Sequence, residues 1–299
     1  MSVLVAGSAN LDFVVRADHI PAPGETVLGR AFRTFPGGKG ANQAIACART
    51  GGAATQMLLA LGDDTFAASI EASLREAGVA MHTVRAASEP TGTAFICVSD
   101  NAENAITVAP GANAALRAEH LPPLAGVSHL LLQLETPLAA VTAYARSAHA
   151  AGVQVVLNAA PARALPSELL DAVDLLVVNE GELAALSGVA GDIDSALERI
   201  GVASVIVTLG ERGCLARTPQ GFLRQAGFAV DAIDTTAAGD TFCGALVAAL
   251  QRGEPLADGL RFASAAAAIA CTRLGAQSSI PGFDEVRAFL ASHTSAPNP

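Results

Sequence analysis

A stretch of small residues in the last quarter of the chain, Asp234 to Ala245, carries the groups best suited to chemistry. It runs into an apolar, alanine-rich segment that predicts a helix, with Ala238, Gly239 and Asp240 in its first turn. The first N–H groups of a helix have no partners within it and face outward with the positive end of the helix dipole. Small side chains let an anion approach these groups closely, which suits phosphoryl transfer.

Asp240 does not fit a simple anion site, because its carboxylate would repel a phosphate in the ground state. We interpret it as a base that accepts the proton of an attacking hydroxyl. The alternative is an aspartate that only caps the helix. This stretch by itself leaves both interpretations open.

Asn10 and Asp12 follow a short apolar run, Val3 to Ala6, that is typical of a buried parallel strand. Two polar side chains two residues apart on an extended segment point the same way and could bind neighbouring hydroxyls of a polyol. A simple Asx turn is the alternative. The segment lacks the later glycines of a dinucleotide-binding loop.

A glycine turn from Phe35 to Gly40 leads into a predicted helix that continues to about Thr50. Its spacing differs from that of a Walker A loop, and no Ser or Thr follows Lys39. What remains is a turn that a ligand can approach closely, with Lys39 and Asn42 as donors. An ordinary loop with a solvated lysine is the alternative.

The elements that must position these groups alternate along the chain. Apolar strands and Ala/Leu-rich helices predict an α/β fold with a central, mostly parallel sheet covered by helices on both faces. We expect strands at 56–61, 130–133, 154–157, 175–178 and 204–209, and helices at 65–76, 137–150, 240–251, 255–272 and 284–291, with two short helices before residue 200. We predict a single domain over residues 1–293 and a disordered tail over 294–299.

Two β-prone segments, residues 13–35 and 93–109, interrupt this alternation. The first contains short pieces such as Thr26 to Leu28, separated by Pro and Gly. Each segment is too short for a domain, so we expect both to form one small β lid.

Several of the predicted strands end in polar residues, as a ligand crevice at the carboxyl edge of a parallel sheet requires. These residues are Glu135, Asn158, the Asn179 to Glu182 stretch and the Thr208 to Gly213 stretch. The carboxylates near Asn179 could reach a Mg²⁺ ion through water. For that stretch alone, a capped and acidic first helical turn is the better interpretation.

Composition excludes several classes of protein. The chain has 299 residues, 51% of them hydrophobic, with a net charge of −10 that argues against nonspecific binding to nucleic acid or to an anionic membrane. The five cysteines are far apart and form no C-x-x-C pair, which indicates free thiols in a reducing compartment. With no basic leader or apolar run of membrane-spanning length, we expect a cytoplasmic protein.

Together, these motifs resemble the PfkB carbohydrate-kinase family over essentially the whole chain. The resemblance is carried by GSANLD, PAPGETVLG, GGKGANQA, APGANAAL, QLETPL, NAAPAR, Asn179-x-x-Glu182, TLGERG, Asp234-TTAAG-Asp240 and AAAAIACTRLGAQSSIP. Many family members carry glycine at the position of Ala237, and an alanine there costs little if its φ is negative.

The resemblance implies roles for individual residues. Asp240 is similar to the catalytic base, and the N–H groups of Ala237, Ala238, Gly239 and Asp240 to its anion hole. The implied sugar ligands are Asn10, Asp12, Gly38, Lys39, Asn42, Glu135 and Asp240. The implied ATP-binding residues are Asn179, Thr208, Gly210, Gly213, Gly239 and Ser264. Glu182 matches a residue that supports Mg²⁺ through water, and a K⁺ site is implied at Asp234, Thr236, Ala270, Arg273, Gly275 and Ser279.

The implied activity is ATP-dependent phosphorylation of D-ribose at its 5-hydroxyl, with Mg²⁺ and stimulated by K⁺, in a homodimer formed through the lid. The same chemistry on deoxyribose, another sugar or a nucleoside is the first alternative. A non-catalytic module that senses a sugar or nucleotide is the second, and the presence of Asp240 and Lys39 argues against it.

Overall fold

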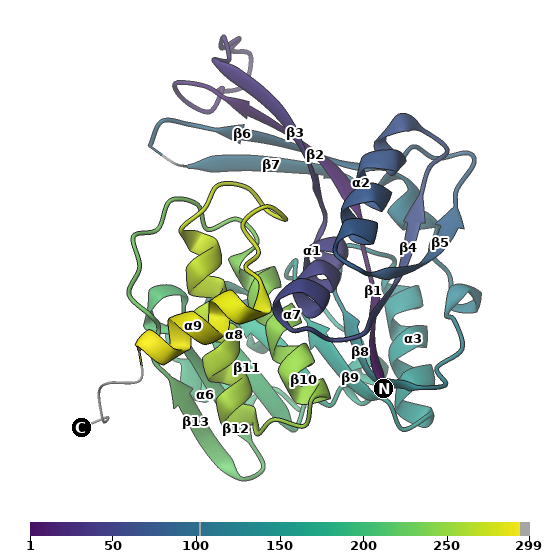
Figure 1. Ribbon diagram of the computed structural model, residues 1–299, viewed down its shortest axis with the longest axis vertical. Coiled ribbons are helices and arrows are strands. Elements are labelled where there is room, and N and C mark those ends of the chain that lie inside the picture. Colours follow the sequence, from purple (N-terminus) through teal and green to yellow (C-terminus); the bar gives the residue numbers. More distant parts are fainter. Residues whose placement is uncertain (102, 294–299) are drawn as a thin grey trace.

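The computed structural model describes residues 1–101 and 103–293. Over these residues the strands form two separate sheets, shown in Figure 1. The larger has the order β13-β12-β11-β10-β9-β8-β1-β4-β5 and the smaller the order β3-β2-β6-β7. The α/β class and the small second sheet that the sequence predicts are therefore confirmed.

The larger sheet is parallel from β5 to β11 and antiparallel only at β12 and β13. Its strands are β1 (Ser2–Ala6), β4 (Thr55–Leu61), β5 (Ala80–Arg85), β8 (Val127–Leu132), β9 (Gln154–Asn158), β10 (Leu175–Asn179), β11 (Ser204–Thr208), β12 (Cys214–Thr218) and β13 (Gly221–Gln225). The strands β5, β12 and β13 were not predicted from the sequence.

Helices cover both faces of this sheet because its strands are apolar on both sides. In β1, Val3 and Val5 belong to the core under α1 (Lys39–Ile45), α2 (Thr65–Glu76), α7 (Ala238–Gln251), α8 (Leu256–Cys271) and α9 (Phe283–Ser292). Leu4 and Ala6 belong to the opposite core, under α3 (Leu138–Ala150), α4 (Ser167–Leu170), α5 (Glu180–Ser187) and α6 (Ile193–Glu198).

Shorter helical turns connect these elements. α1 continues as a π-helix over Ala46–Thr50, so the helical segment ends where the sequence predicts. The 3₁₀ turns are η2 (Gly111–Ala115), η3 (Ala118–His120) and η4 (Gly210–Arg212). No helix in residues 1–101 or 103–293 combines the length and apolar character needed to cross a membrane.

The smaller sheet consists of β2 (Asn10–Arg16), β3 (Ala31–Gly37), β6 (Gly92–Val98) and β7 (Asn104–Ala109). It projects from the larger sheet at the top of Figure 1. Its two segments start earlier than predicted, at Asn10 and Gly92, and the expected β piece at 26–28 is not a strand. Asn10 and Asp12 therefore lie on a lid strand.

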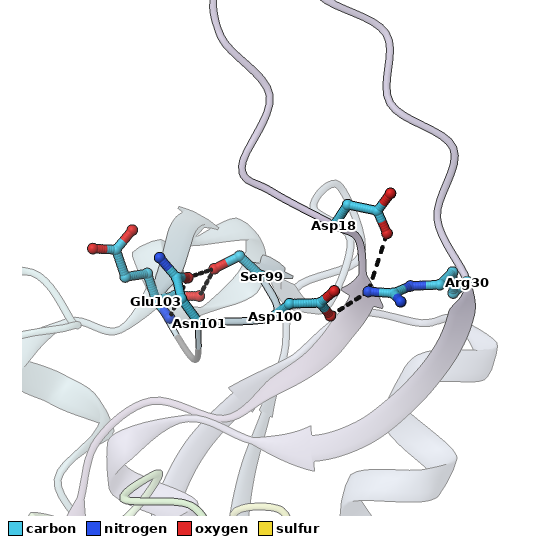
Figure 2. A network of polar contacts seen from close by, with 6 residues as sticks. All are labelled: Asp18, Arg30, Ser99, Asp100, Asn101 and Glu103. Carbon is cyan, nitrogen blue, oxygen red and sulfur yellow. Dashed lines mark hydrogen bonds and ion pairs between the residues drawn. The ribbon is translucent and has the colours of Figure 1, made fainter.

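An ion-pair cluster joins the far ends of the lid segments, as Figure 2 shows. The Arg30 guanidinium contacts the carboxylate of Asp100 and lies 3.1 Å from that of Asp18. Beside it, the Ser99 hydroxyl donates to the main-chain carbonyl of Glu103 at 3.0 Å. Because the charged side chains are more than half exposed, water screens their attraction, and we assign them a role in shape more than in stability.

Candidate active site

The first turn of α7 has the features that the sequence predicts for an anion site. The N-cap residue is Ala237, which has no side chain able to cap the helix. Ala238 N–H donates to the Thr235 carbonyl at 3.2 Å, whereas no described residue accepts from the N–H groups of Ala237, Gly239 and Asp240. Donors therefore remain for a bound anion at the positive end of the helix dipole.

Ala237 corrects one expectation. Its φ is 59°, so it adopts the left-handed conformation, and it is the one residue other than glycine with positive φ in the described chain. An L-residue pays roughly 1–2 kcal/mol for this conformation, because its Cβ approaches the following carbonyl oxygen. The alanine is therefore strained, and the strain lies in the turn that carries the predicted anion-binding N–H groups.

The Asp240 side chain is buried and does not cap the helix. Its Oδ2 accepts a hydrogen bond from Asn42 Nδ2 at 2.9 Å, and its Oδ1 accepts one from Gln43 Nε2, also at 2.9 Å. Each carboxylate oxygen has two acceptor positions, so each keeps one for another donor. An aspartate that only caps its helix would bond to N–H groups of the first turn, and Asp240 does not.

Two further amides lie behind this pair. Gln43 Nε2 also donates to Asn158 Oδ1 at 3.0 Å, and Gln43 Oε1 accepts from Gln133 Nε2 at 2.6 Å. The sequence interpretation assigned no role to Gln43 or Gln133 and noted Asn158 only as a strand end. The available signal was a glutamine directly after Asn42, within the GGKGANQA motif.

The predicted sugar ligands gather on the lid side of Asp240. Asn10 and Asp12 are both buried on β2. Gly37, on the paired strand β3, leaves room for the Asp12 carboxylate, since a Cβ there would lie 2.1 Å from Asp12 Oδ2. Glu135 Oε2 accepts from Lys39 N–H at 3.0 Å and from the Ser8 hydroxyl at 2.5 Å. Asn42 Oδ1 is buried and has no partner among the described residues, as expected of an oxygen that accepts from a ligand hydroxyl.

Another amide that was not predicted anchors Asn10. Asn113, on η2, is 1% exposed and accepts from Ala9 N–H at 3.0 Å. Its Nδ2 donates to Asn10 Oδ1 at 2.8 Å. The contact requires glycine at position 92, because a Cβ there would lie 2.2 Å from Asn113 Nδ2. Asn113 belongs to the APGANAAL motif, which was quoted for the resemblance without a role for this residue.

Four carboxylates and one ammonium share this region. Burial raises the pKa of Asp12 to about 7, and the negative charges of Glu135 and Asp240 add to the shift. The charge of Asp240, followed by those of Glu135 and Glu182, raises the pKa of Lys39 in spite of burial. Lys39 is thus held as a cation among carboxylates, at the junction of the lid and α7.

A cavity of about 210 Å³ opens at the carboxyl edge of the larger sheet. Its lining includes residues from the ends of β9, β10 and β11 and from the start of α7, namely Lys39, Asn158, Ala160, Val177, Val178, Asn179, Glu182, Thr208, Thr235, Ala237, Gly239, Asp240 and Cys243. Asn10, Asp12, Gly38, Asn42 and Glu135 are not in this lining and lie beyond Lys39 and Asp240. Of the polar strand ends that the sequence predicts, Asn158, Asn179, Glu182 and Thr208 therefore meet at this edge.

Among the residues predicted to bind ATP, Asn179, Thr208 and Gly239 line the cavity, whereas Gly210, Gly213 and Ser264 do not. Gly210 and Gly213 flank the η4 turn after β11, both with positive φ. Ser264 is buried in α8, with its hydroxyl 3.9 Å from Cys214 Sγ.

The Asn179 and Glu182 side chains form a reciprocal cap on α5. Asn179 N–H donates to Glu182 Oε2, and Glu182 N–H donates to Asn179 Oδ1, both at 2.8 Å. The capped-helix interpretation therefore holds for this stretch. It does not exclude the other, because Glu182 lines the cavity and its Oε1 has no described protein partner. Burial raises the pKa of Glu182.

The predicted K⁺ loop brings two distant segments together through Asp234. Its Oδ1 accepts from the Thr236 N–H at 2.9 Å and from the Thr236 hydroxyl at 2.5 Å, and its Oδ2 accepts from Gly275 N–H at 2.9 Å. Although burial opposes the shift, these bonds lower the pKa of Asp234 and keep it ionised. An ionised carboxylate between two loops of backbone carbonyls fits a monovalent cation.

The other predicted cation ligands are engaged locally. The Ala270 carbonyl accepts from Arg273 N–H at 3.2 Å, and the Ser279 hydroxyl donates to the Ala276 carbonyl at 2.8 Å. The Arg273 guanidinium is paired with Glu285. The group that Arg273 offers to a cation is therefore its backbone carbonyl.

Comparisons with known proteins agree with this geometry. Residues 1–282 match the pfkB family of carbohydrate kinases. The chain is 40% identical to a ribokinase of Haemophilus influenzae, covering 97% of this chain and 98% of that protein. It is 32% identical to a deoxyribokinase of Salmonella typhi, covering 97% and 99%. The solved structure of Arabidopsis thaliana ribokinase complexed with ribose and ATP superposes with a TM-score of 0.88 at 32% identity, covering 97% and 98%. This chain belongs to the pfkB family of carbohydrate kinases.

Proposed function

We propose that this protein transfers the γ-phosphoryl group of ATP to the 5-hydroxyl of D-ribose, giving ribose 5-phosphate and ADP. The observation that carries the proposal is the buried Asp240 carboxylate, held at the anion-binding start of α7 on the wall of the cavity. The likeness over nearly the whole chain to ribokinases, one of them complexed with ribose and ATP, supports ribose as acceptor.

In the proposed reaction, the sugar lies on one side of Asp240 and ATP lies on the other. The ribose O5 forms a bond to the γ-phosphorus while the bond from that phosphorus to the β–γ bridging oxygen breaks, and ADP leaves. Asp240 accepts the O5 proton at a free carboxylate position as the new bond forms. The unpaired N–H groups of Ala237, Gly239 and Asp240 donate to the charge that develops on the transferred group.

The acceptor sugar is assigned to the lid side of Asp240, where polar side chains are dense. Asn10, Asp12, Asn42 and Glu135 offer carboxylate and amide oxygens to ring hydroxyls, and Lys39 adds a cationic donor. The unpaired Asn42 Oδ1 supports a donor at this place. Gly38 has φ 89° and a Cβ there would lie 2.9 Å from Ala9 Cα, so only glycine allows this tight approach.

ATP is assigned to the cavity at the ends of β10 and β11. Asn179, Thr208 and Gly239 line it, and Gly210, Gly213 and Ser264 complete the proposed nucleotide site. Mg²⁺, when bound to the nucleotide, neutralises phosphate charge and orients the transferred group. The free Glu182 Oε1 fits a contact to such an ion through water.

K⁺ is assigned to the loop around Asp234, where it would brace the turn that carries the anion-binding N–H groups. Thr235 lies between Asp234 and the strained Ala237, and its carbonyl accepts from Ala238 N–H. A cation bound at residues 234–236 and 270–279 is thus connected to the active turn by a few main-chain bonds.

The assembly is proposed to be a cytoplasmic homodimer that joins through the lid. Exposed aromatic side chains on the lid, Phe32 and Phe95, support a partner surface there. The cysteines Cys47, Cys97, Cys214, Cys243 and Cys271 are all free, which fits a reducing compartment. The lid closes over the sugar to exclude water that would compete for the γ-phosphoryl group.

The experiment that tests this function is coupled ADP release over a panel of pentoses, hexoses and nucleosides. We expect the highest kcat/KM for D-ribose, with ribose 5-phosphate identified as the product. If no acceptor released ADP above the rate of ATP hydrolysis, the proposal would be wrong and a sensing module would replace it.

Deoxyribose is the second candidate acceptor, favoured by the similarity to a deoxyribokinase. Sites built to hydrogen-bond a hydroxyl reject an analogue that lacks it, because their buried polar groups are then left unpaired. A ratio of kcat/KM for ribose over 2-deoxyribose well above one supports ribose, and a ratio below one supports the second candidate.

A further inference from the structure

A line of buried amides runs behind the carboxylate proposed as base. Gln43 lies at its centre, on α1, and is 0% exposed. Its Nε2 bonds to both Asp240 Oδ1 and Asn158 Oδ1, at 2.9 and 3.0 Å, and its Oε1 accepts from Gln133 Nε2. These residues come from α1, α7, β9 and the end of β8, so four separate elements meet here.

The main chain of β10 fixes which group donates and which accepts in each hydrogen bond of this line. The Val177 carbonyl can only accept, and it takes a hydrogen bond from Asn158 Nδ2 at 3.3 Å. Asn158 therefore presents its Oδ1 to Gln43, and the Gln43 NH₂ group donates a hydrogen bond to that oxygen. Gln133 supports the same orientation from the other side, because it donates to Gln43 Oε1. A flipped Gln43 amide would face Asp240 with an oxygen and repel it.

The backbone beside these amides leaves room for their side chains because it carries a glycine. A Cβ on Gly7 would lie 1.9 Å from Gln133 Oε1, so a larger residue at position 7 would displace the Gln133 amide. Gln133 is 0% exposed and Asn158 is 8% exposed, which makes an unpaired donor or acceptor here costly. Both polar atoms of the Gln43 amide and of the Asn158 amide are hydrogen-bonded, which favours one arrangement of these two side chains. Gln133 Oε1 has no partner among the described residues.

Asp240 needs such support because its carboxylate can rotate and must present one oxygen to the acceptor hydroxyl. Asn42 also bonds to it, but the proposed function places Asn42 in contact with the sugar. Gln43 is fully buried, so we expect its contact with Asp240 to persist when a ligand binds. Misplacement of a reacting group by about 1 Å can cost on the order of a hundredfold in rate.

The geometry points to Gln43 as a positioning residue that fixes the Asp240 carboxylate for proton abstraction, with Asn158 and Gln133 setting the direction of its amide. This inference rests on the proposed function, because it gives Gln43 a role only through Asp240. Gln43 itself contacts no substrate. Its effect should therefore appear in kcat and leave the binding of both substrates nearly unchanged.

The test is Gln43→Met, which keeps side-chain length and volume but removes the donor. We expect kcat for D-ribose to fall about 10- to 100-fold while KM for ribose and ATP stays within about threefold. Gln133→Met, which leaves Gln43 in place but removes one of its supports, should lower kcat by a smaller factor. If Gln43→Met folds poorly, the kcat of Gln133→Met still tests the inference.

Gln56→Met is the matched control. Gln56 lies on β4, where it bonds to the Ser2 hydroxyl and to His82, far along the sheet from the carboxyl edge. The substitution removes the same amide and about as many hydrogen bonds. We expect it to lower the melting temperature and to leave kcat unchanged, which separates a loss of stability from a loss of positioning.

A double variant decides whether Gln43 acts through Asp240. With Asp240 replaced by Asn, adding Gln43→Met should lower the residual kcat by less than threefold, because the base it positions is already gone. If the two effects multiplied, or if Gln43→Met raised KM and spared kcat, the inference would be overturned. If Asp240→Asn itself had no effect on kcat, the proposed function would fail instead.

Discussion

At the scale of residues, the proposed acceptor site places carboxylates closer together than their charges favour. Asp12 is buried with Glu135 and Asp240 as its charged neighbours, and its pKa is raised to about 7 as a result. A bound sugar would supply hydroxyl donors that favour the charged form of these groups. We therefore expect a bound sugar to offset part of the repulsion among these carboxylates.

The raised pKa of Asp12 gives a prediction for stability. In the unfolded chain Asp12 loses its proton near its usual value of 3.8, whereas the folded protein keeps that proton until about pH 7. Between these values the folded state binds more protons, so this contribution to stability is present at low pH and is lost as pH rises through about 7. Asp12→Asn removes the dependence, and its melting temperature relative to the parent should be higher at pH 8 than at pH 5. A difference that does not change with pH would contradict this.

Residue types and spacing predicted Asp240, Lys39, Asn42 and the first turn of α7, because a base, a cation and a small-residue helix start have recognisable chemistry. They could not predict Gln43 or Asn113. The roles of these amides depend on partners more than a hundred residues away, Asp240 for the first and Ala9 for the second. Nor could they predict the positive φ of Ala237, which the surrounding loops impose on an ordinary residue.

At the scale of elements, the helix boundary that the sequence predicted best is one marked by a capping residue. α2 has the predicted bounds because Asp64 caps it, accepting from the N–H groups of Phe66 and Ala67. The strands β5 and β13 are the two edge strands of the larger sheet, and β12 lies next to β13. Their mixed polar sequences lack the continuous apolar run by which β1, β8 and β10 were recognised.

The loops around Asp234 carry a prediction at this scale. Replacing K⁺ by Na⁺ or by a large organic cation should lower kcat, because the proposed bound ion would brace the turn before α7. Asp234→Ala should lose most of this dependence, since the carboxylate that joins Thr236 to Gly275 is gone. Initial rates in matched chloride salts test it, with ionic strength held constant. Equal parent rates in all of the salts would exclude the assigned cation loop.

At the scale of the whole molecule, the lid carries two exposed aromatic side chains, Phe32 and Phe95. Phe13 stacks between Phe32 and Phe95, with ring centroids 6.0 and 5.3 Å apart, and the two outer rings are 63% and 54% exposed. Each outer ring is exposed to water on one side and packs against Phe13 on the other. Exposed aromatic rings of this kind are typical of an interface between subunits. Figure 1 shows this sheet standing clear of the larger one, where a second copy could reach it.

The dimer prediction follows from these rings. Introducing Asp at both Phe32 and Phe95 should convert the protein to a monomer in sedimentation equilibrium, because burying two carboxylates opposes association. Phe222→Asp is the matched control, since Phe222 is 59% exposed on β13, outside the lid. A parent protein that is monomeric at micromolar concentration, or a double variant that stays dimeric, would contradict lid-mediated assembly.

The most direct measurement of the proposed chemistry is kcat for Asp240→Asn, with D-ribose and ATP both saturating. Asparagine preserves shape and removes the base, so we expect kcat to fall by roughly 10²–10⁴-fold. Ribose affinity should change far less, because Asn10, Asp12, Lys39, Asn42 and Glu135 remain. If the variant melted like the parent, bound both substrates and turned over within a few-fold of the parent rate, Asp240 would not be the base and the proposed mechanism would be wrong.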